Sequence, residues 1–216
     1  MTTSRTSRPG AEQSLLTKAG YHHGNLRAAL IEGAVALVRT RGTRRFTLSE
    51  AARVAGVTSA APYRHFDSRE ALLATVAERG FEQLRAAMGS VEPEAFDDPM
   101  DGVIALGVRY VEFAESEPQI FKLMFSVDDR LPASEAGLAA LEMLTRTLES
   151  AHRAGRLNVD VDTATRAAWA LAHGVATLRI DGMRTFGGAD GDDASATLRA
   201  LLRGLDSSPA PHSHVS

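Results

Sequence analysis

Hydrophobic residues recur along most of the chain at spacings of three and four positions, which is the period of one face of an α-helix. No stretch alternates apolar and polar residues as a half-buried strand does, and no internal repeat is evident. The pattern therefore predicts an all-α fold, a helical bundle. It predicts helices over residues 69–88, from about 103 to before Pro118, 120–125, 138–155, 162–181 and 194–205. Asp162 is expected to cap the helix over 162–181.

Residues 47–73 have a different pattern, that of two short helices around a tight turn, followed by the start of a third helix. Thr47 and Glu50 have the spacing of a capping box, so the first helix should begin near Leu48. Gly56 then supplies the backbone freedom for the turn. This arrangement is that of a helix-turn-helix DNA-binding motif.

The second short helix is expected to begin at Thr58 or Ser59, either of which can act as its N-cap. Pro62 then falls in the first turn or at its edge, where a missing N–H is least costly. The long helix that follows is expected to be capped by Asp67 or Ser68.

In a helix-turn-helix motif, the N-terminal residues of the second helix face base edges in the major groove. The candidates for base contacts are four small residues, Thr58, Ser59, Ala60 and Ala61. The candidates for phosphate contacts are Thr47, Tyr63, Arg64, His65 and Arg69. The alternative is a compact helical hairpin in which Tyr63 and Phe66 are core aromatics. Phe66 is expected to be buried in either case, whereas Tyr63 can combine a buried ring with an exposed hydroxyl.

The residues that carry these features resemble the DNA-binding domain of the TetR family of bacterial transcriptional regulators. The resemblance covers about a quarter of the chain, from Tyr21 to Leu73, as YHHGNLRAALIEGAVALVRTRG and then FTLSEAARVAGVTSAAPYRHFDSREALL. The AGV turn and the PYRHF run are its most specific parts. It implies a three-helix DNA-binding head, a helical ligand-binding and dimerisation body, and repression relieved by a small-molecule effector.

Residues 169–186 resemble the C-terminal domain of a TetR subgroup named for its Trp and His-Gly signature, which Trp169, His173 and Gly174 match. The spacing places Trp169 and His173 on one face of a helix, and Gly174 allows another helix to approach closely. His173 is then either a hydrogen-bonded core residue or a ligand contact. The same choice between core and effector pocket applies to a set of large side chains, Tyr110, Phe113, Phe121, Met124, Met143, Trp169 and His173.

Specific recognition is expected to need two heads on an inverted repeat, because one head reads only a few base pairs. We therefore expect a homodimer on double-stranded DNA. The resemblance implies that the last two long helices form a four-helix dimer interface. The candidate interface residues on these helices are Leu171, Val175, Leu178, Leu198 and Leu202.

Charge is divided unequally along the chain. Residues 1–70 hold eleven Lys or Arg against five Asp or Glu, a net charge of +6, whereas residues 71–216 hold thirteen against twenty-two, a net charge of −9. A basic head suits DNA, because neutralising phosphates releases counterions. The arginines at 39–45 either contact phosphates or form a solvated helix end. We expect a flexible basic arm at 1–20, a DNA-binding head at 21–68, a ligand-binding and dimerisation body at 69–205, and a disordered tail at 206–216.

Several classes of function are excluded or disfavoured by composition. The chain contains no cysteine, which excludes a disulfide framework, a thiolate metal site and a cysteine nucleophile. Its seven histidines are scattered without metal-site spacing, so we expect no metal, no cofactor and no enzyme activity. The sequence has neither a signal-peptide core nor an apolar segment that could span a bilayer, so we expect a cytoplasmic protein. The remaining alternatives are a constitutive dimeric regulator without an effector and a helical adaptor that binds protein.

Overall fold

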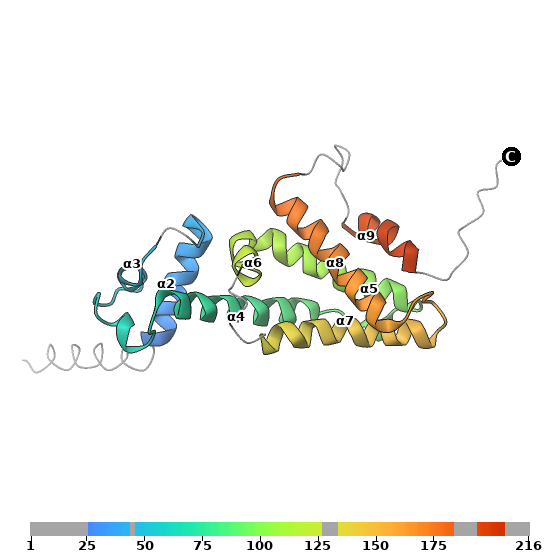
Figure 1. Cartoon of the computed structure of the whole chain (residues 1–216), viewed down its shortest axis with the longest axis horizontal. Helices are drawn as coiled ribbons and strands as arrows, with labels where there is room; N and C mark the ends of the chain where they lie inside the picture. The colour runs from blue at the N-terminus through green and yellow to red at the C-terminus, as the bar shows by residue number, and fades with distance from the viewer. Residues whose placement is uncertain (1–25, 44–45, 127–133, 184–193, 206–216) are drawn as a thin grey trace, which may run out of the picture. The chain divides into compact units, whose positions relative to one another are not determined.

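The computed structural model describes residues 26–43, 46–126, 134–183 and 194–205, without the side chain of Leu201 (Figure 1). Within these ranges the elements are α-helices and short 3₁₀ helices, which confirms the predicted all-α fold. The chain divides into two compact units, Met1–Val76 and Ala77–Ser216. Helix α4 (Arg69–Met88) contributes its first residues to one unit and the rest to the other.

The first unit contains α2 (Leu26–Arg41), α3 (Leu48–Val54), the 3₁₀ helix η1 (Pro62–Arg64) and the start of α4. Helices α2 and α3 pack closely at Gly33, where an added Cβ atom would lie 2.7 Å from the carbonyl oxygen of Ala51. Gly56 has a φ of 71° and forms the turn after α3, as predicted. Phe66 is buried in the core of this unit, also as predicted.

The segment between α3 and α4 differs from the predicted second helix. Residues 59–61 lie in turns and bends, residue 58 has no regular structure, and between α3 and α4 only the three residues of η1 are helical. The physical reason is Pro62, which has no N–H and so cannot donate to the Thr58 carbonyl as an α-helix starting there requires. That carbonyl instead accepts a hydrogen bond from the Ala61 N–H, at 3.0 Å, in the i to i+3 pattern of a 3₁₀ helix.

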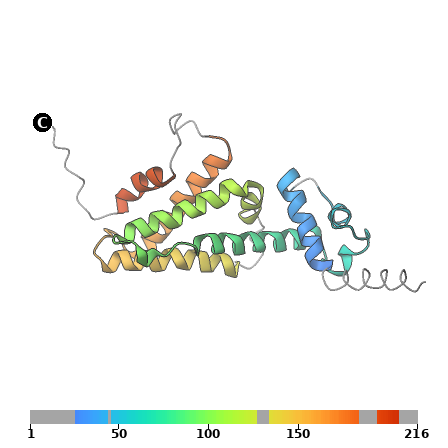
Figure 2. The same ribbon diagram turned by 180° about the vertical axis from the view of Figure 1, so that it is seen from behind.

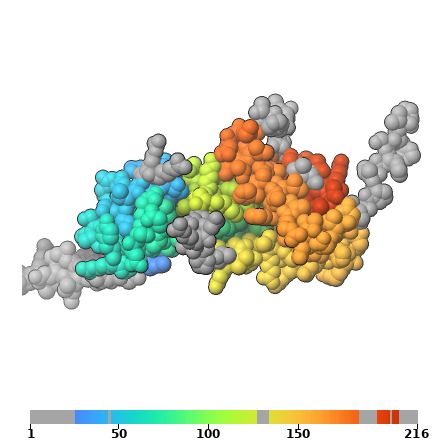
Figure 3. Space-filling model, viewed as in Figure 1, coloured from blue at the N-terminus to red at the C-terminus, as the bar shows by residue number. Residues whose placement is uncertain are grey.

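The second unit is a helical bundle arranged around α5 (Pro99–Ser116). Helix α5 contacts α6 (Pro118–Met124), α7 (Glu135–Arg153), α8 (Val161–Ile180) and α9 (Ala194–Leu202). The 3₁₀ helices η2 (Pro93–Ala95) and η4 (Arg203–Leu205) lie before α5 and after α9. Opposite views show α8 crossing α5 (Figures 1 and 2), and α7 (yellow) and α8 (orange) form much of the surface of the bundle in Figure 3. No helix in the described ranges is both long and apolar enough to cross a membrane.

The core of this bundle joins α5, α7, α8 and α9. Its buried members include Met100, Val103, Ile104, Leu144, Leu148, Ala151, Ala164, Ala168 and Leu202. Glycines bring two further helix pairs together. An added Cβ atom at Gly80 of α4 would lie 2.7 Å from Sδ of Met124 on α6, and one at Gly107 of α5 would lie 3.0 Å from Cδ1 of Leu198 on α9.

Helices α4 to α9 lie where the hydrophobic pattern predicts them. The residues that cap these helices could be identified only from the structure. Oγ of Ser68 accepts a hydrogen bond from the Ala71 N–H at 3.1 Å, so Ser68 caps α4. The prediction that Asp162 caps α8 is wrong. Asp160 is the N-cap, because its carboxylate accepts from the Thr163 N–H at 2.8 Å, and Asp162 lies in the first turn.

Candidate functional site

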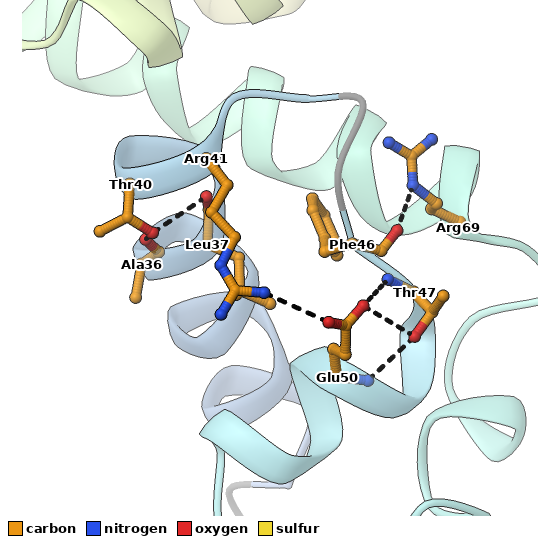
Figure 4. A network of polar contacts seen from close by, with 8 residues as sticks. All are labelled: Ala36, Leu37, Thr40, Arg41, Phe46, Thr47, Glu50 and Arg69. Atoms are coloured by element: carbon orange, nitrogen blue, oxygen red, sulfur yellow. Dashed lines mark hydrogen bonds and ion pairs between the residues drawn. The ribbon is translucent and has the colours of Figure 1, made fainter.

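The start of α3 is fixed by a polar network that also reaches the end of α2 (Figure 4). The Thr47 hydroxyl accepts a hydrogen bond from the Glu50 N–H at 3.2 Å, and the Glu50 carboxylate accepts one from the Thr47 N–H at 2.8 Å. These two bonds confirm the predicted capping box. Arg41 adds an ion pair to the same carboxylate at 3.2 Å. The hydrogen bonds from Thr47, followed by the charge of Arg41, hold the pKa of Glu50 below its ordinary value.

Arg69 supports this network from the start of α4 (Figure 4). Its Nε donates to the Phe46 carbonyl oxygen at 2.9 Å, and its guanidinium lies 5.0 Å from the centre of the Phe46 ring. Arg69 also pairs with Glu70 at 3.3 Å. These contacts position the residue that precedes the cap of α3. The phosphate contacts of Arg69 and Thr47 stay predictions.

The segment predicted to face DNA is exposed on its own unit. Pro62 and Phe66 are buried and attach the segment to the core, while Ala61 is half-buried. Tyr63 has 62% of its surface exposed, so it is not a core aromatic. The exposed candidates for base and phosphate contacts are Thr58, Ser59, Ala60, Tyr63, Arg64 and His65. Small hydroxyl and methyl groups are therefore presented beside a phenol, a guanidinium and an imidazole on one short segment.

Part of the predicted basic surface lies outside the described residues, namely 1–25 and 44–45. Arg39 and Arg41 are described and are exposed in the last turn of α2. Their charges favour the C-terminal end of the helix dipole. Arg41 also has a defined structural partner in Glu50, so at least one of the arginines at 39–45 helps to hold α2 against α3.

The second unit contains an aromatic cluster, which we define as Phe81, Tyr110, Phe121, Phe125, Trp169 and His173. His173 contacts four of the other rings, with centroid distances of 4.6 Å to Phe125, 5.4 Å to Phe121, 5.9 Å to Trp169 and 6.3 Å to Tyr110. The Tyr110 hydroxyl oxygen lies 2.9 Å from Nδ1 of His173. The described residues contain no group of three or more His, Asp or Glu that could hold a metal ion.

Burial sets the protonation of the two polar members of the cluster. Burial raises the pKa of Tyr110 well above its ordinary value, and a hydrogen bond from Trp169 opposes part of this rise. Partial burial lowers the pKa of His173 below its ordinary value of 6.5. Tyr110 is therefore protonated and His173 neutral at physiological pH. The Tyr110 hydroxyl and Nδ1 of His173 share a hydrogen bond, in which the imidazole tautomer decides which of the two groups donates.

The aromatic cluster contains four of the seven predicted ligand residues, Tyr110, Phe121, Trp169 and His173. Of the others, Phe113 and Met124 are buried and Met143 is half-buried. Phe81 and Phe125 were not among the candidates, although their rings lie 5.5 Å apart within the cluster. Spacing marks both as apolar helix residues, but it does not reveal that Phe125, at the end of α6, contacts both Phe81 of α4 and His173 of α8. The role of these residues in ligand binding stays a prediction.

The predicted dimer residues differ in exposure. Leu198 and Leu202 are 1% and 4% exposed, and both pack within their own chain. Packing in the core of the chain is therefore enough to explain why both residues are apolar, and no partner chain is needed for this. Val175 is buried and Leu171 is half-buried, whereas Leu178 has 45% of its surface exposed.

The exposed side of α8 combines small residues with an apolar one. Ala170, Gly174 and Leu178 follow one another at one-turn spacing, and all three are exposed. An added Cβ atom at Gly174 would meet nothing within 4 Å. Helix α9 likewise exposes Ala196 and Ala200, four residues apart. Both helices thus present narrow faces that the described part of the chain leaves uncovered.

Fold and site together define the class of the protein as a helical, helix-turn-helix DNA-binding protein with a separate helical bundle. The family profile described as "Bacterial regulatory proteins, tetR family" matches residues 30–76, and that described as "Tetracyclin repressor-like, C-terminal domain" matches residues 103–205. The chain belongs to the TetR family of transcription regulators, which bind DNA and are not enzymes. Its assignment to the subgroup with the Trp and His-Gly signature stays a prediction.

Solved structures agree with this assignment. A protein of unknown function from Rhodococcus sp. RHA1 is 34% identical, with 86% of this chain and 97% of that chain covered and a TM-score of 0.70. A regulatory protein of the tetR family from Rhodococcus RHA1 shares the fold at 20% identity, 83% and 96% coverage and a TM-score of 0.59. A TetR family transcription regulator from Marinobacter aquaeolei VT8 shares it at 15% identity, 83% and 95% coverage and a TM-score of 0.62. No curated protein matches the chain.

Proposed function

We propose that the protein is a homodimeric repressor that binds an inverted-repeat operator and is released from it by a small-molecule effector. The observation that carries the proposal is the exposed segment Thr58–His65, which Pro62 and Phe66 attach to the core beside a firmly capped α3. We assign DNA binding to residues 21–68, and ligand binding and dimerisation to residues 69–205. The site of action is the cytoplasm, where the DNA is.

The proposed DNA contacts follow from side-chain type and exposure. Ser59 and Ala60 are small and exposed, so the backbone can approach base edges and their hydroxyl and methyl groups can discriminate between bases. Tyr63 and His65 are exposed and long enough to reach phosphate oxygens, which fix register without reading sequence. The net charge of +6 over residues 1–70 favours this placement on DNA.

The proposed dimer uses the exposed faces of α8 and α9. Ala170 and Gly174 on one helix, and Ala196 and Ala200 on the other, let helices of two chains approach closely, while Leu178 supplies apolar surface. Two copies related by a two-fold axis would form a four-helix contact and present two DNA-binding heads. Leu198 and Leu202 are core residues of each chain and stabilise the helix α9 that carries part of this interface.

The effector is proposed to act through a difference in its affinity for the DNA-bound and released states. Helix α4 belongs to both compact units, so a change in its position within the bundle is one route to the head. A constitutive dimeric regulator is the second candidate. It is favoured by the burial of Tyr110 and Phe121, which are 5% and 2% exposed and already pack against each other.

The test of DNA recognition measures the affinity of purified protein for a panel of duplexes between about 50 and 200 mM salt. Binding is expected to weaken steeply as salt rises. Tyr63→Ala and His65→Ala should weaken binding to all duplexes about equally, whereas Ser59→Ala should change the preference at one position of each half-site by about 1–3 kcal/mol. Ser90→Ala, an exposed serine of the second unit, is the matched control. Binding that is independent of both salt and sequence would favour the protein-binding adaptor instead.

A further inference from the structure

Arg27 lies in the first turn of α2 and is exposed on the surface of the first compact unit. The central carbon of its guanidinium lies 5.3 Å from the centre of the Phe66 ring, and Phe66 itself is only 4% exposed. An aromatic face attracts a guanidinium, which is more weakly hydrated than an ammonium and so loses little by stacking. The Arg27 cation therefore has a defined place beside a buried ring.

Phe66 connects this cation to the exposed segment Thr58–His65. The Phe66 N–H donates a hydrogen bond to the Pro62 carbonyl oxygen at 2.9 Å, and both residues are buried. Figures 1 and 2 show the start of α2 beside the segment that joins α3 to α4. The ring that attaches the segment to the core thus also fixes Arg27 next to it, although the two lie far apart in the sequence.

The stacked guanidinium keeps its hydrogen-bonding edge available. The five N–H donors of an arginine lie in the plane of the group, whereas an aromatic ring covers only one face. Two other arginines of this unit have carboxylate partners, since Arg41 pairs with Glu50 at 3.2 Å and Arg69 pairs with Glu70 at 3.3 Å. Arg27 makes no ion pair or hydrogen bond within the described ranges. Its charge and its donors are therefore open to an anion from outside the chain.

We propose that Arg27 contacts a backbone phosphate of the bound DNA, and that Phe66 is the positioning residue that holds its guanidinium for this contact. The edge of a guanidinium matches two phosphate oxygens, and the net charge of +6 over residues 1–70 favours a polyanion. The DNA-binding surface then extends from the segment Thr58–His65 onto the start of α2. The contact adds affinity and fixes register without reading sequence. This inference rests on the proposed function for the side of the head that faces DNA.

The salt dependence of binding distinguishes a phosphate contact from a structural role. The full-length protein is titrated between about 50 and 200 mM salt with two duplexes of equal length, one enriched from a random pool and one of unselected mixed sequence. Arg27→Ala should weaken binding to both duplexes about tenfold for each bound head. It should also make the slope of log affinity against log salt concentration less steep by about 1 for each head, because one phosphate contact is lost.

Two further variants control for charge. Arg27→Lys keeps the charge but loses the planar edge, so it should retain most of the salt slope while weakening binding to both duplexes. Arg85→Ala removes an exposed arginine of α4 in the second unit, and it should change neither the affinity nor the slope.

A double-mutant cycle tests the role of Phe66. Phe66→Leu keeps an apolar side chain and removes the ring face, so it should weaken binding to both duplexes by about two- to fivefold. In the Arg27→Ala background the same substitution should have no further effect, because the cation that the ring holds is already gone. Thermal unfolding identifies a variant that fails to fold, and Phe66→Met then takes the place of Phe66→Leu.

Three results would overturn the inference. An Arg27→Ala variant with the affinity and the salt slope of the wild type contradicts the phosphate contact. A loss confined to the enriched duplex contradicts it as well, because Arg27 would then read a base. An effect of Phe66→Leu that persists in the Arg27→Ala background contradicts the positioning role.

The wild type separates these results from a failure of the proposed function. Equal, salt-dependent binding of both duplexes by the wild type contradicts sequence-specific recognition alone, since the Arg27 contact is measured on either duplex. A wild type that binds neither duplex contradicts both proposals.

Discussion

His173 packs its ring against four other aromatic rings of the bundle. A lone histidine on an apolar helix face is either a satisfied core residue or a ligand contact. The structure combines elements of both, because Nδ1 is paired with Tyr110 while the ring is only half-buried among aromatic neighbours. The sequence contained the spacing of Trp169 and His173, but the partner on α5 lies 63 residues away and has no local signal.

The lowered pKa of His173 predicts how stability depends on pH. The folded-state pKa lies below the ordinary value of 6.5, so as the pH falls the unfolded chain binds a proton at this site first. The contribution of neutral His173 to stability is therefore complete above about pH 6.5 and is lost as the pH falls through the lowered pKa. Tyr110, which shares a hydrogen bond with the His173 ring, stays protonated throughout this range.

The measurement is the free energy of unfolding in urea from about pH 8 to about pH 5. His173→Phe should lose less stability than the wild type over this range, because the site that titrates differently in the two states is gone. His152→Phe, at an exposed position of α7, is the matched control and should follow the wild type. Identical pH profiles for His173→Phe and the wild type would contradict the assigned burial of the imidazole.

At the scale of elements, hydrophobic spacing was sufficient to predict that α4 to α9 exist and where they lie. It failed where a single backbone group decides the outcome. Pro62 removes the N–H that an α-helix from Thr58 needs, and the choice between Asp160 and Asp162 as cap depends on the position of the Thr163 N–H. The hydrophobic spacing also could not predict which helices pack together, because the apolar face of α9 could pack against a partner chain as well as against α5. The structure places Leu198 and Leu202 against the chain itself.

The exposed face of α8 predicts a specific effect on assembly. Ala170→Arg places a long charged side chain on the proposed dimer face, where it cannot be buried without a partner charge, so the protein should become largely monomeric. Ala86→Arg, at an exposed alanine of α4, is the matched control and should leave assembly unchanged. Analytical ultracentrifugation measures both, and circular dichroism checks that each variant stays folded. A wild type that is monomeric at micromolar concentration, or an Ala170→Arg variant that stays dimeric, would contradict this interface.

At the scale of the whole molecule, the two parts of the chain differ in charge and in length. The basic first part carries the exposed segment Thr58–His65, while the acidic bundle supplies a core, uncovered helix faces and an aromatic cluster. In the proposed function, dimerisation links these parts to specificity, because each head reads only a few base pairs and two heads double the sequence that is read. An effector that binds the bundle must then change operator affinity by the same factor by which the operator changes effector affinity.

The central claim, sequence-specific binding of DNA by two copies of the chain, is tested most directly by selecting bound duplexes from a pool of random sequence. The expected result is enrichment of an inverted repeat, and scrambling one half of it should greatly reduce affinity, because one head then loses its base contacts. A pool that shows no enrichment over random DNA would contradict sequence-specific binding. Enrichment of a single undivided site, bound by one chain, would contradict the dimer.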